Sequence, residues 1–176
     1  MSRTAEEPAE PDASTAQLVA SQIGRMPRAP WRVCTRCTFG RPAVISSPPV
    51  LSDGSRFPTL HWLTCPWLIE GAGALESQGA ADDFSQRAAA DPEFASALAS
   101  ADEELRRARA AAHGGPDPCG DVGLAGQRDP LGVKCLHAHV ALALAGISDP
   151  IGQETLARVG YPCEDDLCAR KLGATT

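Results

Sequence analysis

The sequence predicts an α+β fold that is predominantly helical, with about five or six helices and one small antiparallel β-hairpin. Only 5% of the 176 residues are aromatic, whereas alanine is abundant. This composition favours close packing of small-residue helices over a sandwich or barrel. The length allows one domain with a substantial core and is too short for two ordinary ones. We expect a single domain over residues 14–172 after a disordered tail, residues 1–13, which has too little apolar content to fold.

Capping residues, prolines at first helical positions and terminal glycines delimit the expected helices. Apolar residues at helical spacing support each of them. The expected helices cover residues 14–26, 66–79, 91–112, 133–145 and 150–160, with weaker helical segments over residues 82–90 and up to Leu172.

The hairpin is expected from residues 43–46 and 56–64, which are joined across two prolines and the turn-forming sequence Ser52-Asp53-Gly54-Ser55. The prolines predict that the first strand lies at an edge of the sheet. The glycine- and proline-rich residues 113–130 are expected to form a long loop.

Composition also bears on the location and partners of the chain. No run of apolar residues is long enough to span a membrane, and the first twelve residues are acidic and contain proline, unlike a signal peptide. We therefore expect a cytoplasmic protein without membrane insertion. The net charge of −6 argues against a generic nucleic-acid coat protein.

Basic residues are nevertheless concentrated near the N-terminus. No Asp or Glu occurs between Asp12 and Asp53, and aromatic residues stand near the basic ones. Such a stretch can bind phosphate groups of nucleic acid or polyphosphate, although it can also be an ordinary solvated loop. The candidate anion-binding residues are Arg25, Arg28, Arg32, Arg36 and Arg41.

Seven cysteines are the second unusual feature. In a reducing compartment, and with an odd count, they are expected to ligate metal, to act in catalysis or simply to be buried. Three of them, Cys65, Cys135 and Cys163, fall near expected helix N-termini, where backbone N–H groups favour the thiolate that binds metal. The pair Cys34 and Cys37 forms a C-x-x-C motif, which alone is a weak indication of a zinc knuckle or a redox pair.

The expected helix over residues 133–145 begins with the sequence Lys134-Cys135-Leu136-His137-Ala138-His139. Spacing of four residues predicts that Cys135 and His139 share a helix face, while His137 points elsewhere. Lys134 is one of only two lysines in the chain, and its ammonium group could neutralise thiolates or contact phosphate, or simply face solvent.

Four stretches resemble one known family. They are residues 36–42 (Arg-Cys-Thr-Phe-Gly-Arg-Pro), residues 57–66, residues 133–139 and Pro162-Cys163. They resemble a bacterial family catalogued as domain of unknown function 501, over roughly residues 14–163. The resemblance implies that four of the seven cysteines matter most: Cys37, Cys65, Cys135 and Cys163. Members are often encoded near an exopolyphosphatase-like protein and a septum-formation initiator, which implies a phosphate-rich ligand or a division-related partner.

Three functional hypotheses follow. The first is a metal site formed by these four cysteines, holding a [4Fe-4S] cluster or zinc, with His139, Lys134 or His137 as second-shell groups or alternative ligands. The second is an interaction module that binds nucleic acid or polyphosphate through the basic stretch. The third is a small enzyme with Cys135 or Cys65 as nucleophile and His139 or His61 as base.

Overall fold

The computed structural model describes residues 11–28 and 30–173. Most of the tail expected over residues 1–13 lies outside these residues. The described part contains a three-stranded antiparallel sheet, seven α-helices and one short 3-10 helix. The elements are α1 (Ala13–Ile23), β1 (Arg32–Arg36), β2 (Pro42–Ser46), β3 (His61–Leu63), α2 (Pro66–Ser77), α3 (Ala80–Ala90), α4 (Pro92–His113), the 3-10 helix (Leu124–Gly126), α5 (Leu136–Leu144), α6 (Pro150–Val159) and α7 (Leu167–Gly173).

The predicted fold class, α+β and predominantly helical, is confirmed. Side-chain caps start three of the helices as the sequence suggested. Asp91 accepts hydrogen bonds from the N–H groups of Glu93 and Phe94 at the start of α4, and Asp149 accepts one from Gly152 at the start of α6. Asp12 caps α1 by accepting a bond from the N–H group of Thr15, two residues before the expected helix start at residue 14. The helices therefore begin close to their expected positions.

The sheet differs from the expected hairpin in two ways. An additional strand, β1, pairs antiparallel with β2, and β2 pairs with β3, so that the strand order is β1-β2-β3. The prediction that the first hairpin strand lies at an edge was therefore wrong, because β2 is the central strand. Pro42 is tolerated there as the first residue of the strand.

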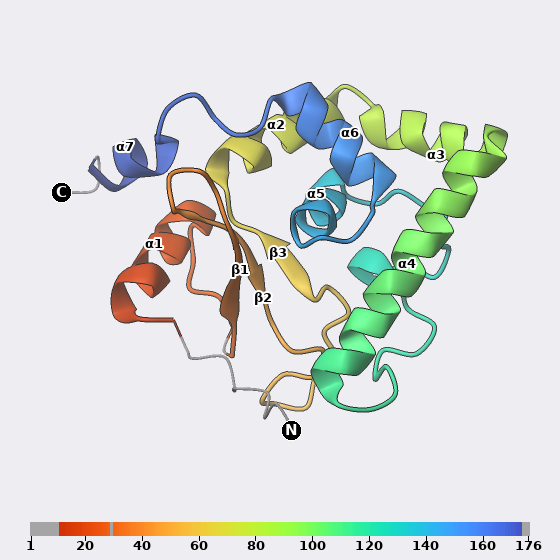
Figure 1. The fold of residues 1–176 in the computed structure, drawn as a ribbon, viewed down its shortest axis with the longest axis horizontal. Coiled ribbons are helices and arrows are strands. Elements are labelled where there is room, and N and C mark those ends of the chain that lie inside the picture. Colours follow the sequence, from red (N-terminus) through yellow and green to blue (C-terminus); the bar gives the residue numbers. More distant parts are fainter. Residues whose placement is uncertain (1–10, 29, 174–176) are drawn as a thin grey trace, which may run out of the picture.

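Both faces of β2 are covered, which explains why all five of its residues are buried. Successive side chains of a strand point to opposite faces. Ile45 packs with Val19 of α1 and with Trp31 on one face. Val44 packs on the other face with Val140 of α5 and Leu68 of α2. The sheet therefore separates α1 from the main group of helices (Figure 1).

Helix α5 lies at the centre of that group, against β3, α2 and α6 (Figure 1). Six of its nine residues are buried, and Leu136 and Val140 are completely inaccessible to solvent. A helix that is apolar on nearly every side must be surrounded by other elements. Groups attached to the ends of α5 are therefore held by the packing of the whole domain.

One buried ion pair connects the expected loop after α4 to that helix. Arg109 of α4 is fully buried, and its Nη2 lies 2.7 Å from Oδ2 of Asp117 and 2.7 Å from the carbonyl oxygen of Val122. Its Nη1 donates to the carbonyl of Pro58 at 3.1 Å. One guanidinium thus joins α4, the loop and the segment before β3. Within the described ranges, no helix combines the length and apolarity needed to cross a membrane.

Candidate metal centre

Three side chains with metal-binding atoms meet where the end of α2 approaches the start of α5. They are Glu76, in the last turn of α2, Cys135, the residue directly before α5, and His137, in its first turn. Within the described residues they form the one group of three or more such side chains whose ligand atoms lie within 4.8 Å of one another. All three are partly exposed. The group is therefore accessible from solvent.

The distances within this group are short. Nδ1 of His137 lies 3.1 Å from Oε1 of Glu76 and 3.5 Å from Sγ of Cys135. Its other ring nitrogen, Nε2, lies 3.1 Å from the carbonyl oxygen of Ile69. A carbonyl can only accept, so Nε2 carries a proton and Nδ1 faces the thiol and the carboxylate. This is the arrangement usual for a metal-ligating histidine, whose second nitrogen donates to a carbonyl.

The carboxylate of Glu76 is itself held in place by the backbone of α5. The N–H group of Leu136 donates to its Oε1 at 2.6 Å. Cys135, although it occupies the capping position, makes no side-chain capping bond. Glu76 therefore satisfies a free backbone donor at the N-terminus of α5 from a different helix. The same bond fixes the carboxylate oxygen next to His137.

The electrostatics of the group favour a positive charge at its centre. The hydrogen bond with Cys135 is the largest cause that raises the pKa of His137 to about 9. The charges of Cys135 and Glu76 and the bond to Ile69 add to it, and burial opposes it. Without a metal, the proton on Nδ1 thus stands between a sulfur and a carboxylate oxygen. A metal cation can take the place of that proton.

The structure corrects the predicted pairing of Cys135 with His139. The backbone of Cys135 is extended, with φ −160° and ψ 116°, so the residue lies outside α5 and the four-residue helical rule does not apply to it. Its Sγ contacts His137 instead. Lys134 is exposed and its Nζ lies 3.4 Å from the carbonyl of Ala125, so its closest described contact is with the 3-10 helix.

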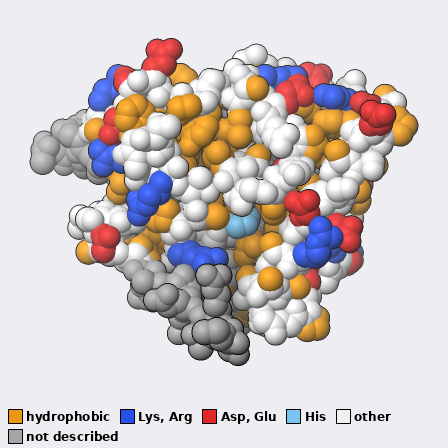
Figure 2. All heavy atoms as spheres, in the orientation of Figure 1, with side chains coloured by type: hydrophobic (Ala, Val, Ile, Leu, Met, Phe, Trp, Pro, Cys, Tyr) orange, Lys and Arg blue, Asp and Glu red, His pale blue; other side chains and the backbone are white. Residues whose placement is uncertain are grey.

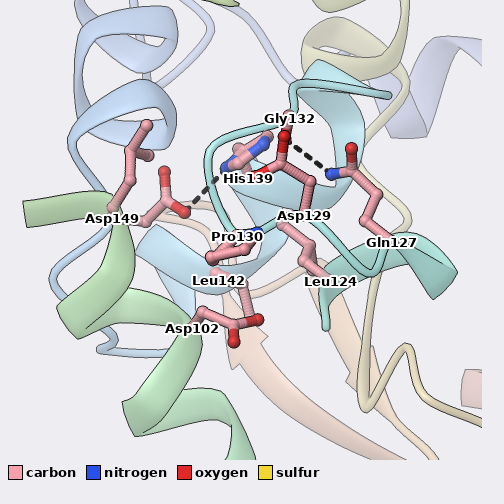
Figure 3. A pocket seen from close by; sticks show the side chains of 10 residues that line it. Asp102, Leu124, Gln127, Asp129, Pro130, Gly132, His139, Leu142 and Asp149 are labelled. Atoms are coloured by element: carbon pink, nitrogen blue, oxygen red, sulfur yellow. Dashed lines mark hydrogen bonds and ion pairs between the residues drawn. The ribbon is translucent and has the colours of Figure 1, made fainter. Parts of the chain in front are cut away.

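His139 points to the other side of α5, toward α6 and the loop before α5 (Figure 3). Its Nδ1 lies 2.7 Å from Oδ2 of Asp149, and both side chains are at most 6% exposed. The imidazole borders a cavity of about 20 Å³, also lined by Asp129 and Gln127. This volume holds roughly one water molecule. His139 therefore joins α5 to the start of α6 and lies outside the Glu76, Cys135 and His137 group.

The other three predicted cysteine ligands lie in a different part of the molecule. Cys37 packs at the edge of the core cluster that contains Cys65, together with Tyr161. Cys163 follows Tyr161 by two residues, and the buried Cys168 lies in α7. Cys135 packs against a different core cluster, and the Gln22 side chain that bonds the carbonyl of Pro42 also contacts Cys168. The remaining cysteines are Cys34, which is exposed, and Cys119, which is buried elsewhere.

The predicted stabilisation of thiolates at helix N-termini is not general. Cys65 does precede α2, but burial raises the pKa of its thiol to about 11, against a smaller lowering by the N–H groups of Leu68 and Trp67. Cys163 does not lie at a helix N-terminus, because α7 begins only at Leu167. Burial outweighs the helix terminus at Cys65.

The predicted catalytic base His61 has a different partner from the cysteines. Its Nδ1 lies 2.8 Å from Oγ of Ser46 on the neighbouring strand β2. Burial, followed by the charge of Arg32, lowers the pKa of His61 to about 4. A base with so low a pKa is weak at neutral pH. The cysteine and histidine that do contact each other are Cys135 and His137.

The candidate anion-binding arginines have different surroundings. Arg41 makes a two-pronged ion pair with Asp166, and Arg36 donates to the carbonyl of Gly40 at 2.9 Å. On the face shown in Figure 2, acidic side chains stand among the basic ones. Arg25 and Arg28 are different, since both line a cavity of about 240 Å³.

Glu76 is the member of this candidate group that was not predicted from the sequence. It lies in an expected helix among other polar residues, and no local pattern distinguishes it. The sequence could have indicated Glu76 only if the end of that helix had been predicted to lie beside residues 135–137. Cys168 was likewise set aside, because the resemblance did not include it.

A comparison with protein families matches residues 33–157 to the family described as Protein of unknown function (DUF501). The chain belongs to this DUF501 family. The match covers more than half of the chain and includes Glu76, Cys135 and His137. It ends before Cys163 and Cys168. Neither a curated protein nor a solved structure matches the chain.

Proposed function

We propose that this DUF501 protein is a metal-binding protein in which Glu76, Cys135 and His137 hold a zinc ion. The observation that carries the proposal is the mutual approach of the three ligand atoms within 4.8 Å. Thiolate, imidazole and carboxylate are all usual zinc ligands. The proposal keeps the metal-binding hypothesis. Its ligands, however, are one cysteine, one histidine and one glutamate instead of the four cysteines expected from the sequence.

Two of the three ligand-to-ligand distances are near those expected for tetrahedral zinc. From the usual zinc bond lengths, two ligands at the tetrahedral angle lie about 3.4 Å apart for nitrogen and oxygen, and about 3.6 Å apart for nitrogen and sulfur. The corresponding distances from Nδ1 of His137 are 3.1 Å to Glu76 and 3.5 Å to Cys135. Zinc can therefore enter with only small movements of these side chains.

Three protein ligands leave the fourth position of a tetrahedral zinc ion open. Structural zinc sites usually have four protein ligands, whereas sites with three bind water or substrate at the fourth position. The partial exposure of all three residues gives solvent access to that position. The proposed site is therefore of the kind that binds an exchangeable ligand.

Metal titration of the purified, chelator-treated protein tests this function. We expect one zinc ion or one cobalt ion per chain at this site, and a thiolate-to-cobalt absorption band in the cobalt form. Cys135→Ser should remove that band, and His137→Gln and Glu76→Gln should each weaken binding at least about tenfold. Cys34→Ser and His113→Gln, at exposed positions, are the matched controls. Equal zinc affinity in His137→Gln and in the wild type would refute the site.

Alkylation of Cys135 during the same zinc titration distinguishes a metal site from a cysteine enzyme. The imidazolium of His137 beside Sγ of Cys135 also suits an activated nucleophile. With zinc bound, Cys135 should resist alkylation by iodoacetamide, and chelation should restore the reaction. Rapid alkylation of Cys135 at saturating zinc, with no protection, would favour the enzyme.

A second candidate function rests on the cavity beside Arg25 and Arg28. Trp62 lines it, with the Arg25 guanidinium 5.5 Å from its ring centroid, and stacks on Phe57 at 5.5 Å. Cationic groups next to aromatic faces suit phosphate compounds that carry a base. We propose a nucleotide or the end of a polyphosphate as ligand.

Calorimetric titration with a nucleoside triphosphate and with inorganic polyphosphate at two salt concentrations tests this second function. Binding should weaken as salt rises and should be lost in the double variant Arg25→Gln/Arg28→Gln. Arg107→Gln, on the exposed face of α4, is the control. Salt-independent binding, or equal binding by the double variant, would exclude it.

A further inference from the structure

We propose that Cys37, Cys65, Cys163 and Cys168 form a second metal centre that takes a [4Fe-4S] cluster. It shares no ligand with the zinc site and does not depend on it. Compared with the ligand set expected from sequence, Cys168 takes the place of Cys135. The argument rests on how four separate segments of the chain are tied together around the start of β2.

Hydrogen bonds bring three of these cysteines to one short stretch of backbone, residues 41–43. The N–H of Cys37 donates to the carbonyl of Arg41 at 2.9 Å, and the N–H of Cys65 donates to the carbonyl of Ala43 at 3.3 Å. Between them, the side chain of Gln22 donates to the carbonyl of Pro42 at 2.8 Å and lies 3.2 Å from Sγ of Cys168.

The fourth cysteine, Cys163, lies between two residues, Tyr161 and Asp166, that contact the same region. Before it, Tyr161 packs against the core cluster that contains Cys65, as Cys37 also does. After it, Asp166 makes the two-pronged ion pair with Arg41, at 2.8 and 3.0 Å. These contacts hold the segment from Tyr161 to Cys168 beside the start of β2.

In the part of the chain that the structure describes, these four thiols do not lie at the spacing of a single zinc site. Four thiolates around one zinc ion lie about 3.8 Å apart. Within the described residues, no three of these cysteines have sulfur atoms within 4.8 Å of one another. A cubane cluster binds one thiolate at each of its four irons, so its ligands stand farther apart than those of one ion.

The surroundings suit a buried cluster with net negative charge. Cys65 and Cys168 are 5% and 7% exposed, and neighbouring apolar residues such as Leu68 keep water away. The guanidinium of Arg41 lies beside the site, with Asp166 as its counterion.

Anaerobic reconstitution of the full chain with ferrous iron and sulfide tests the proposal. The wild-type protein should turn brown and bind about four iron and about four sulfide ions per chain. Cys37→Ser and Cys168→Ser should each lose most of the iron, whereas Cys135→Ser and Cys119→Ser should keep it. Circular dichroism of each variant checks folding. Cys37 lies in a partly exposed turn, so its variant decides the matter if Cys168→Ser does not fold.

Two results would overturn this inference. One is a wild-type protein that binds no iron and sulfide, or that binds a single zinc ion through these thiols. The other is loss of the cluster in Cys135→Ser with retention in Cys168→Ser, which would restore the ligand set expected from sequence. Neither result depends on whether Glu76 and His137 bind zinc.

Discussion

At the residue scale, the chemistry of the candidate centre depends on Cys135 lying one position before its helix. The sequence predicted that Cys135 and His139 share a helix face while His137 points elsewhere, because the expected helix started three residues too early. Propensity cannot locate a helix start to that precision when no side-chain cap marks it. Here the capping oxygen comes from Glu76 on a distant segment.

The raised pKa of His137 predicts how the stability of the metal-free protein changes with pH. Because the pKa of His137 is about 9 in the folded protein, against an ordinary histidine value of 6.5, the added stability is fully present below about pH 6.5. It is lost as pH rises through about 9. The free energy of unfolding of the wild type, minus that of His137→Gln, should therefore fall across this window in denaturant titrations with chelator. A difference that is constant with pH would contradict the raised pKa.

Zinc affinity should show the opposite trend over the same window. Below about pH 9 the metal must displace the proton on Nδ1 of His137, so the apparent association constant should rise as pH rises, by about tenfold per unit for one proton. Calorimetry in two buffers of different ionisation enthalpy measures the proton release. Binding without release of a proton near neutral pH would argue against His137 as a ligand.

The buried ion pair of Arg109 gives a prediction about stability at the same scale. Asp117→Asn removes the anionic partner of a guanidinium with no solvent exposure, and should lower the free energy of unfolding by about 3–5 kcal/mol. Asp121→Asn, at an exposed position of the same loop, should change it by less than about 0.5 kcal/mol. Urea denaturation of the two variants provides the comparison. Equal stability would show that Asp117 does not neutralise Arg109.

At the element scale, α5 is placed by its contact with α6, and Gly152 permits that contact. A Cβ atom on Gly152 would lie 2.2 Å from the carbonyl oxygen of His139. The sequence predicted α6 from its cap and its terminal glycine, but not this close approach, because it depends on how two helices pack. Strand β1 was not predicted from the sequence for a different reason. Its alternate residues are exposed and bulges interrupt its pairing, so it lacks a strong apolar pattern.

Gly152→Ala should therefore destabilise the protein, by about 1–3 kcal/mol or more, because backbone would have to move. Gly73→Ala in α2 is a suitable control, since its added Cβ would meet only Nε2 of His137, at 4.0 Å. That substitution should be neutral or stabilising, by up to about 1 kcal/mol. Thermal or urea unfolding of the pair gives the comparison. A Gly152→Ala variant as stable as Gly73→Ala would contradict the packing described between α5 and α6.

At the scale of the whole molecule, both proposed centres are built from segments far apart in the sequence. Composition, helical spacing and capping residues were sufficient to predict an α+β domain with one central helix. They could not show that α2 ends beside the start of α5, or that α7 returns to the beginning of β2. Such contacts depend on burial summed over the whole core rather than on any local pattern.

Zinc should stabilise the whole domain, because it joins α2 to α5 in the folded state only. At a free zinc concentration one hundred times the dissociation constant, the added stability should be about 2.7 kcal/mol. Differential scanning calorimetry should show a higher Tm for the wild type with zinc, and a much smaller shift for Cys135→Ser. The same shift in both proteins would mean that zinc binds elsewhere.

X-ray absorption spectroscopy of the zinc-loaded protein tests the central claim most directly, because it counts the atoms around the metal. The zinc site should show one sulfur at about 2.3 Å and three nitrogen or oxygen atoms at about 2.0–2.2 Å. This is the ligand set of Glu76, Cys135, His137 and one solvent or added ligand. A shell of four sulfur atoms, or a shell without sulfur, would contradict it.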